Sequence, residues 1–191
     1  WGPPGVGKTT LAKIIANTLD RPFYTLSAVT SGVKEVREVI DKAKNQHLFN
    51  ARPAFLFIDE IHRFNKSQQD SLLGAVEQGI VTLIGATTEN PSFEVISPLL
   101  SRCQVYVLKP MEDSELQTLL DRALSTDIGL QKRHIEVKET EALFRFSGGD
   151  ARKLLNILDI IVGASDGDIV ISDDYVTECL QQNIALYDKS G

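Results

Sequence analysis

Cysteine is scarce in this sequence, long apolar runs are absent, and basic residues are in the minority. The 191 residues include only Cys103 and Cys179, which lie far apart without metal-ligand spacing, so we interpret both as packing residues. A helix that spans a membrane needs about 20 consecutive apolar residues, and no apolar run here approaches that length, so we expect no membrane partner. Twenty lysines and arginines against 26 acidic residues give a net charge of −6. Contact with nucleic acid would therefore need a local patch or other parts of the protein.

Residues 2–9 read Gly-Pro-Pro-Gly-Val-Gly-Lys-Thr and match the phosphate-binding pattern G-x-x-x-x-G-K-[ST] at every fixed position. Glycines in such a loop let backbone N–H groups turn inward around phosphate oxygens. Lys8 is placed to reach the β- and γ-phosphates, and the Thr9 hydroxyl to bind Mg²⁺. The apolar pattern over 8–19 predicts a helix whose positive end faces the same anion. The predicted nucleotide-binding residues are Gly2, Pro3, Pro4, Gly5, Val6, Gly7, Lys8, Thr9 and Thr10.

The start of the sequence lacks the β-strand that normally precedes a phosphate loop. The loop begins at Gly2, and Trp1 is not an initiator methionine. The last residues, 186–191, stop without an obvious domain end. We therefore expect an internal fragment of a longer protein.

Strand and helix patterns alternate through residues 1–110, which predicts a parallel sheet with helices on both faces. The expected strands cover 23–26, 54–58, 81–85 and 104–108, and the expected helices cover 8–19, 33–49 and a segment from a cap at Asn65 and Gln68 to about 76. Residues 183–191 are expected to begin a linker. Residues 111–182 are expected to form a small all-helical lid domain. Its expected helices cover about 113–125, 139–147, 150–164 and 173–182, the first with a capping box at Ser114 and Gln117.

Two acids follow the buried apolar strand at 54–58. Asp59 is suited to hold Mg²⁺ opposite Thr9, and Glu60 can act as general base toward the attacking water. Two acids can also simply mark a solvated strand end. The phosphate loop some fifty residues upstream favours the catalytic interpretation.

Three further residues are candidates for contact with the γ-phosphate. Thr88, or as second choice Asn90, follows the strand at 81–85 and could orient the water, although turn formers are also common before a proline. Arg102 could stabilise charge on the transferring phosphoryl group, in its own site or in a neighbour's. Arg152 lies in the first turn of a predicted helix and opposes the helix dipole, which suggests an anionic partner or a salt bridge to an acid such as Asp150.

Together these motifs resemble an AAA+ ATPase module, over nearly the whole chain. The resemblance is closer to the replication-associated recombination protein A family, which includes the eukaryotic WRN-interacting protein. The stretches that carry this closer resemblance are 27–35, 62–70 and 85–93, the second of which reads His-Arg-Phe-Asn-Lys-Ser-Gln-Gln-Asp.

The resemblance implies a five-stranded parallel sheet with a helical lid and ATP with Mg²⁺ as ligands. It implies that Thr88 is a sensor at a strand end, that Arg152 is the lid sensor, and that Arg102 is a finger donated to a neighbouring subunit. It further implies a homo-oligomer that acts on DNA at stalled replication forks and associates with single-strand DNA-binding protein. Such a protein would be cytoplasmic and nucleoid-associated in a bacterium, or nuclear in a eukaryote.

The sequence also leaves two different functions open. A clamp-loader-type subunit or a Holliday-junction-helicase-type subunit would share the core motifs. A nucleotide-dependent scaffold with little turnover would need neither Glu60 nor Arg102, and both are present.

Overall fold

The computed structural model describes residues 1–47, 52–165 and 167–189. Residue contacts divide the chain into two compact units. The first unit comprises Trp1–Gly2 and Gly7–Leu108, and the second comprises Pro3–Val6 and Lys109–Gly191. The middle of the phosphate loop therefore packs with the second unit, while both of its ends belong to the first.

The first unit is built on a parallel sheet in the order β1-β2-β3. Its strands are β1 (Phe23–Ser27), β2 (Ala54–Asp59) and β3 (Val81–Gly85). β2 lies in the centre, and every side chain from Ala54 to Ile58 is buried. A strand covered on both faces needs apolar residues at consecutive positions, which explains the continuous apolar run.

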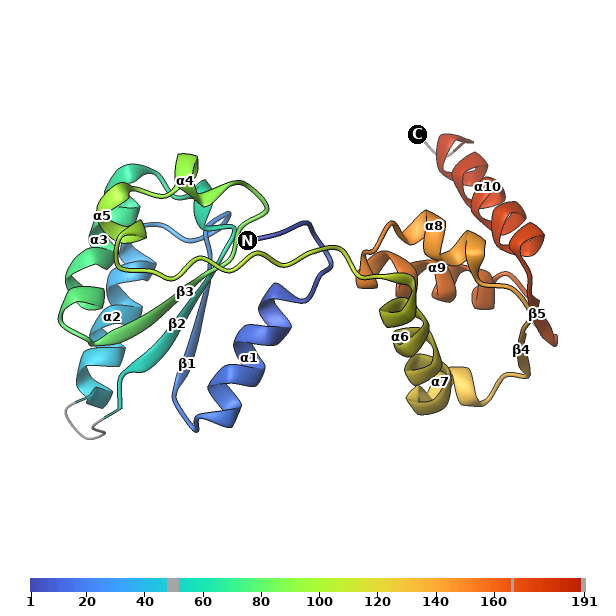
Figure 1. Ribbon diagram of the computed structural model, residues 1–191, viewed down its shortest axis with the longest axis horizontal. Helices are drawn as coiled ribbons and strands as arrows, with labels where there is room; N and C mark the ends of the chain where they lie inside the picture. Colours follow the sequence, from blue (N-terminus) through green and yellow to red (C-terminus); the bar gives the residue numbers. More distant parts are fainter. Residues whose placement is uncertain (48–51, 166, 190–191) are drawn as a thin grey trace. The chain divides into compact units, whose positions relative to one another are not determined.

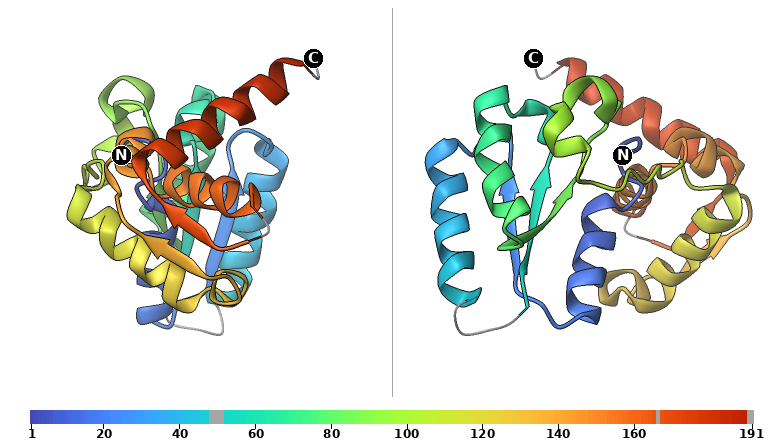
Figure 2. Two further views of the ribbon diagram at one scale, coloured as in Figure 1. Left: turned by 90° about the vertical axis from the view of Figure 1, so that its right-hand side faces the viewer. Right: turned by 60° about the vertical axis from the view of Figure 1, so that its left-hand side comes forward.

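Helices cover both faces of this sheet, as Figure 1 and the right-hand view of Figure 2 show. These are α1 (Lys8–Thr18) on one face, and α2 (Val33–His47) and α3 (Lys66–Glu77) on the other. Leu56 and Ile58 of β2 pack in the core beneath α2 and α3, whereas Phe57 packs against Ala12 of α1. Successive side chains of a strand alternate between faces, so one strand contributes to both cores. The predicted α/β fold is confirmed; residues 48 and 49 of the expected 33–49 helix lie outside the described residues.

Short elements surround the ends of the strands. They are the 3₁₀ turn η1 (Ile61–Arg63), α4 (Pro91–Glu94) and α5 (Ser97–Leu100). The predicted start of α3 is confirmed: Asn65 accepts the Gln68 N–H at 2.9 Å, and the Gln68 side chain accepts the Asn65 N–H at 2.9 Å.

The expected strand at 104–108 is wrong for the described residues. Their first-unit sheet has three strands, where a five-stranded sheet without the strand before the phosphate loop would have four. Among the described residues, 104–108 form backbone hydrogen bonds with Trp1: its backbone nitrogen donates to the Tyr106 carbonyl, and its carbonyl accepts the Leu108 N–H. A groove of about 570 Å³ lies beside them, lined by side chains of α1 and β3 that include Ala12 and Ile84. An apolar segment becomes a strand only where a ladder partner lies beside it.

The second unit is not all-helical, because it also contains a parallel pair of three-residue strands, β4 (Ile135–Val137) and β5 (Ile169–Ile171). Its helices are α6 (Asp113–Thr126), α7 (Ile128–Gln131), α8 (Glu141–Ser147), α9 (Ala151–Gly163) and α10 (Asp173–Lys189). α10 thus continues through most of the segment 183–191, where the sequence predicts the start of a linker.

The predicted capping box of α6 is wrong by two residues. Glu112 is the N-cap, and the Glu115 carboxylate accepts its N–H at 2.9 Å, in place of Ser114 and Gln117. Within the described part of the chain, no helix is both long enough and apolar enough to span a bilayer.

Candidate active site

The phosphate loop leads directly into α1. Gly7 precedes the helix with a φ of 86°, a left-handed conformation that glycine adopts readily, and Gly5 has a φ of 70°. Among the described residues, no side chain caps the N-terminal end of α1. The first-turn N–H groups, which include those of Thr9 and Thr10, are therefore suited to an anionic ligand.

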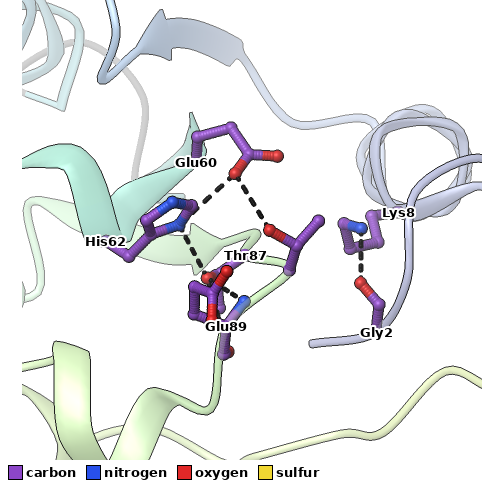
Figure 3. A network of polar contacts seen from close by, with 7 residues as sticks. Gly2, Lys8, Glu60, His62, Thr87 and Glu89 are labelled. Carbon is purple, nitrogen blue, oxygen red and sulfur yellow. Dashed lines mark hydrogen bonds and ion pairs between the residues drawn. The ribbon is translucent and has the colours of Figure 1, made fainter.

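The Lys8 ammonium lies over the beginning of its own loop. Nζ donates a hydrogen bond to the Gly2 carbonyl at 2.7 Å (Figure 3). The Gly2 N–H in turn donates to the Thr87 carbonyl at 3.2 Å. The start of the loop is thus held beside the residues that follow β3.

The carboxyl ends of the three strands meet at one edge of the sheet. Ser27 is in register with Asp59, and Ile58 with Gly85, so Asp59 and Glu60 emerge beside the residues that follow β3. Ligands of parallel α/β sheets bind at this edge. Glu60 has a φ of 53°, a left-handed conformation that costs a non-glycine residue about 1–3 kcal/mol. Such residues cluster at functional sites.

The Glu60 carboxylate is held by two neighbours. Its Oε2 lies 3.4 Å from the donating Thr88 hydroxyl and 3.3 Å from His62 Nδ1. His62 Nδ1 also lies 2.9 Å from Thr87 Oγ1 (Figure 3). Asn90, the second choice from the sequence, instead caps α4 by accepting the Ser92 N–H at 3.0 Å.

The middle of the phosphate loop packs on the N-terminal end of α9. The Gly5 carbonyl accepts the Ala151 N–H at 3.2 Å. The Asp150 carboxylate accepts the N–H groups of Arg152 and Lys153, at 2.8 and 3.0 Å. Asp150 therefore caps α9 through backbone bonds, and the Arg152 side chain is exposed.

Arg102 is held at the C-terminal end of α3. Its NH2 lies 2.7 Å from the Glu77 carboxylate, and its NH1 donates to the Pro98 carbonyl at 2.7 Å. The neighbouring Cys103 is exposed, so its interpretation as a packing residue is wrong, whereas Cys179 is buried in the second unit. Desolvation of its sulfur raises the pKa of the Cys103 thiol above its ordinary value.

Comparison with known families decides the class of this site. The family described as "ATPase family associated with various cellular activities (AAA)" matches residues 1–111, and an "AAA C-terminal domain" matches residues 129–191. The chain belongs to the AAA family of ATPases. The two matches cover most of both units of this AAA chain.

Similar curated proteins carry the names that the sequence resemblance implies. Replication-associated recombination protein A of Coxiella burnetii is 44% identical over all of this chain and 44% of its own length, and that of Haemophilus influenzae is 45% identical with the same coverage. "ATPase WRNIP1" of Dictyostelium discoideum is 43% identical over all of this chain and 24% of its own length. The AAA chain therefore spans less than half the length of these relatives, and the predicted family resemblance is confirmed.

Solved structures share the architecture. The Thermotoga maritima RuvB Holliday junction branch migration motor superposes with a TM-score of 0.73 and 30% identity, over 94% of this chain and 59% of that one. The AAA fold is therefore supported by sequence and by backbone geometry.

The structure brings some of the candidate residues of the AAA site together and places others elsewhere. It brings Glu60 and Thr88 together, and it places Arg102 beside Glu77. His62 and Thr87 were not predicted from the sequence, although a histidine two residues after a strand-end acid and a threonine before Thr88 were available as signals.

Proposed function

We propose that this chain is the ATP-hydrolysing module of a protein that acts on DNA in replication-fork maintenance, recombination and repair. Membership of an ATPase family supports the hydrolysis, and the names of the relatives support the setting. The observation that carries the catalytic assignment is the Glu60 carboxylate. It lies at the carboxyl end of the central strand, within hydrogen-bonding reach of Thr88, in a sheet whose first helix begins with a phosphate loop.

The described residues fit a nucleotide with Mg²⁺. Backbone N–H groups from Gly5 to Thr10 would surround the phosphates, and Lys8 would exchange its bond to the Gly2 carbonyl for the β- and γ-phosphates. Thr9 and Asp59 would hold Mg²⁺, which neutralises phosphate charge when bound. Two protein ligands suffice because Mg²⁺ keeps waters and takes its remaining ligands from the phosphates.

Glu60 would act as the general base. A water oxygen attacks the γ-phosphorus, its proton passes to Glu60, and the bond from the γ-phosphorus to the bridging oxygen of ADP breaks. Thr88 keeps the carboxylate oriented through its hydroxyl. Arg152 and Arg102 would stabilise the charge that spreads over the γ-phosphoryl oxygens, the latter from a neighbouring subunit.

The proposal includes partners and a location. A homo-oligomer would supply Arg102 to each neighbouring site, so hydrolysis would depend on assembly. DNA would stimulate turnover, with contacts spread over the oligomer or supplied by further parts of the protein. By resemblance, single-strand DNA-binding protein would be a partner, and the protein would be cytoplasmic in a bacterium or nuclear in a eukaryote.

A second candidate is a branch-migration or clamp-loader type of motor. The superposition of a RuvB branch migration motor on 94% of this chain supports this candidate. The presence of Glu60 and Arg102, which nucleotide binding alone does not need, argues against a nucleotide-dependent scaffold. The DNA that stimulates turnover distinguishes the candidates: forked DNA for the first, Holliday junctions for a branch-migration motor, and primed DNA for a clamp loader.

The test is steady-state ATP turnover of the full-length protein, without DNA and with forked, primed or four-way DNA.

Glu60→Gln keeps the size of the side chain and removes the base, so we expect near-normal ATP binding with turnover reduced by roughly 10²–10⁴-fold. Lys8→Ala is the matched variant, which should lose ATP affinity itself. Turnover of Glu60→Gln within about threefold of wild type would assign the base elsewhere.

A further inference from the structure

His62 occupies an unusual position for a side chain outside the predicted catalytic set. Glu60 adopts a left-handed conformation, and η1 follows immediately, so the chain turns back after β2. This turn places His62 Nδ1 3.3 Å from the Glu60 carboxylate, as Figure 3 shows. The His62 side chain is only 11% exposed, so its polar atoms depend largely on protein partners.

The groups that face His62 indicate which of its ring nitrogens carries a proton. The Thr87 hydroxyl donates to the Glu89 carbonyl at 3.4 Å and accepts the Glu89 N–H at 3.0 Å. A carboxylate oxygen only accepts hydrogen bonds, so we assign the proton of His62 to Nδ1, which lies 3.3 Å from Glu60 Oε2. The Thr87 hydroxyl, 2.9 Å from the same nitrogen, then meets it as an acceptor. His62 Nδ1 therefore carries the proton and faces two acceptors, Thr87 Oγ1 and Glu60 Oε2.

This arrangement links Glu60 to the end of the neighbouring strand. Thr87 is 3% exposed, and its carbonyl accepts the Gly2 N–H at the start of the phosphate loop. A carboxylate on a flexible side chain otherwise samples several staggered rotamers. The Nδ1–H of His62, whose ring is anchored to the buried Thr87, restricts the Glu60 carboxylate to the rotamers that keep Oε2 near His62.

We propose that His62 is a positioning residue for Glu60, whose Nδ1–H holds the carboxylate in the orientation from which it receives the proton of the attacking water. This inference rests on the proposed role of Glu60 as general base. His62 acts only through Glu60, so it contributes to the rate of hydrolysis and not to nucleotide binding. Groups that hydrogen-bond to the ligands of a metal site orient those ligands in the same way.

The experiment measures single-turnover ATP hydrolysis and ATP affinity in the full-length protein with three substitutions at His62. His62→Ala should lower the hydrolysis rate roughly 10-fold, with ATP affinity within about twofold of wild type. His62→Asn should recover most of the rate, because its amide nitrogen lies as many bonds from Cα as Nδ1 does. His62→Gln, whose nitrogen is one bond farther along, should not.

The matched control is His134→Ala. His134 is exposed in the second unit, and its backbone carbonyl, which the substitution keeps, accepts the Ile169 N–H at 2.9 Å. Loss of its side chain should leave the rate unchanged. In a Glu60→Gln background, His62→Ala should change the residual rate less than about twofold, because the carboxylate that it orients is already absent.

Three results would overturn the proposal: an unchanged rate in His62→Ala, an equal further loss of rate in the Glu60→Gln background, or a loss of thermal stability and ATP affinity that His62→Asn shares. Failure of the proposed function looks different. In that case Glu60→Gln alone hydrolyses ATP near the wild-type rate, whatever stands at residue 62.

Discussion

At the scale of single residues, two glycines of the phosphate loop share a left-handed backbone but differ in their surroundings. A Cβ added to Gly5 would lie 1.6 Å from Asp150 Oδ1, whereas a Cβ on Gly7 would meet nothing within 4 Å. Asp150 cannot move aside freely, because the same oxygen accepts the first-turn N–H groups of α9. Gly5 thus has both a conformational and a steric requirement, and Gly7 only the first.

We expect Gly7→Ala to lower the free energy of unfolding by about 1–2 kcal/mol, the cost of a left-handed backbone in a residue with a Cβ. Gly5→Ala should lose about 1 kcal/mol more, because Asp150 must give up its helix cap. Urea unfolding of the two variants measures the difference. Equal losses would show that the loop moves away from Asp150 without cost.

At the scale of elements, one buried side chain of α3 holds the short helices that lead to Arg102. Gln69 is 2% exposed. Its amide group donates to the carbonyls of Phe64 and Glu94 at 3.0 Å each and accepts the Ile96 N–H at 2.9 Å. These bonds join the turn before α3 to the segment between α4 and α5.

Gln69→Leu keeps a similar volume but leaves three backbone groups without that partner. Each buried polar group left unpaired costs about 1–3 kcal/mol, so we expect a loss of roughly 2–4 kcal/mol after partial relaxation. Asp70→Ala changes the exposed neighbour on the same helix and should stay within about 0.5 kcal/mol. Thermal and urea unfolding compare the pair, and a Gln69→Leu protein as stable as the control would contradict the bridging role.

At the scale of the whole molecule, the proposed role of Arg102 predicts that one copy is not sufficient for hydrolysis. The Arg102 side chain is 42% exposed, and Glu77, its partner at 2.7 Å, is 44% exposed. An ion pair this exposed contributes about 0–1 kcal/mol, so the guanidinium can leave it for a phosphate at little cost. Arg102→Ala should therefore remove most hydrolysis, about 10³–10⁵-fold, with little change in stability or ATP affinity.

Mixed oligomers test whether Arg102 acts on the ATP bound by a neighbouring subunit. An Arg102→Ala copy keeps Lys8 and Glu60, and a Lys8→Ala copy keeps Arg102, so co-assembly should create some intact sites and restore part of the turnover. Native mass spectrometry confirms that mixed oligomers form. No recovery in confirmed mixtures would place Arg102 in its own subunit's site or outside catalysis.

Features that depend on consecutive residues were determined by the sequence alone. The phosphate loop is contiguous, the buried run of β2 reflects burial on both faces, and the cap of α3 is a local exchange between Asn65 and Gln68. The cap of α6 was misplaced because Ser114 and Glu112 both offer a side chain three residues before a partner. Three-residue strands such as β4 are too short to show a period.

Only the tertiary structure decided which residues meet across the sheet. Residues 104–108 have a strand-like composition, but a ladder requires a neighbour at the right distance, and composition does not supply one. The pairing of Glu60 with His62 and Thr88 depends on the left-handed turn after β2 and on the register of β2 with β3. Register and chain reversal are set by packing over the whole sheet, because a shift of one residue would turn every side chain to the opposite face.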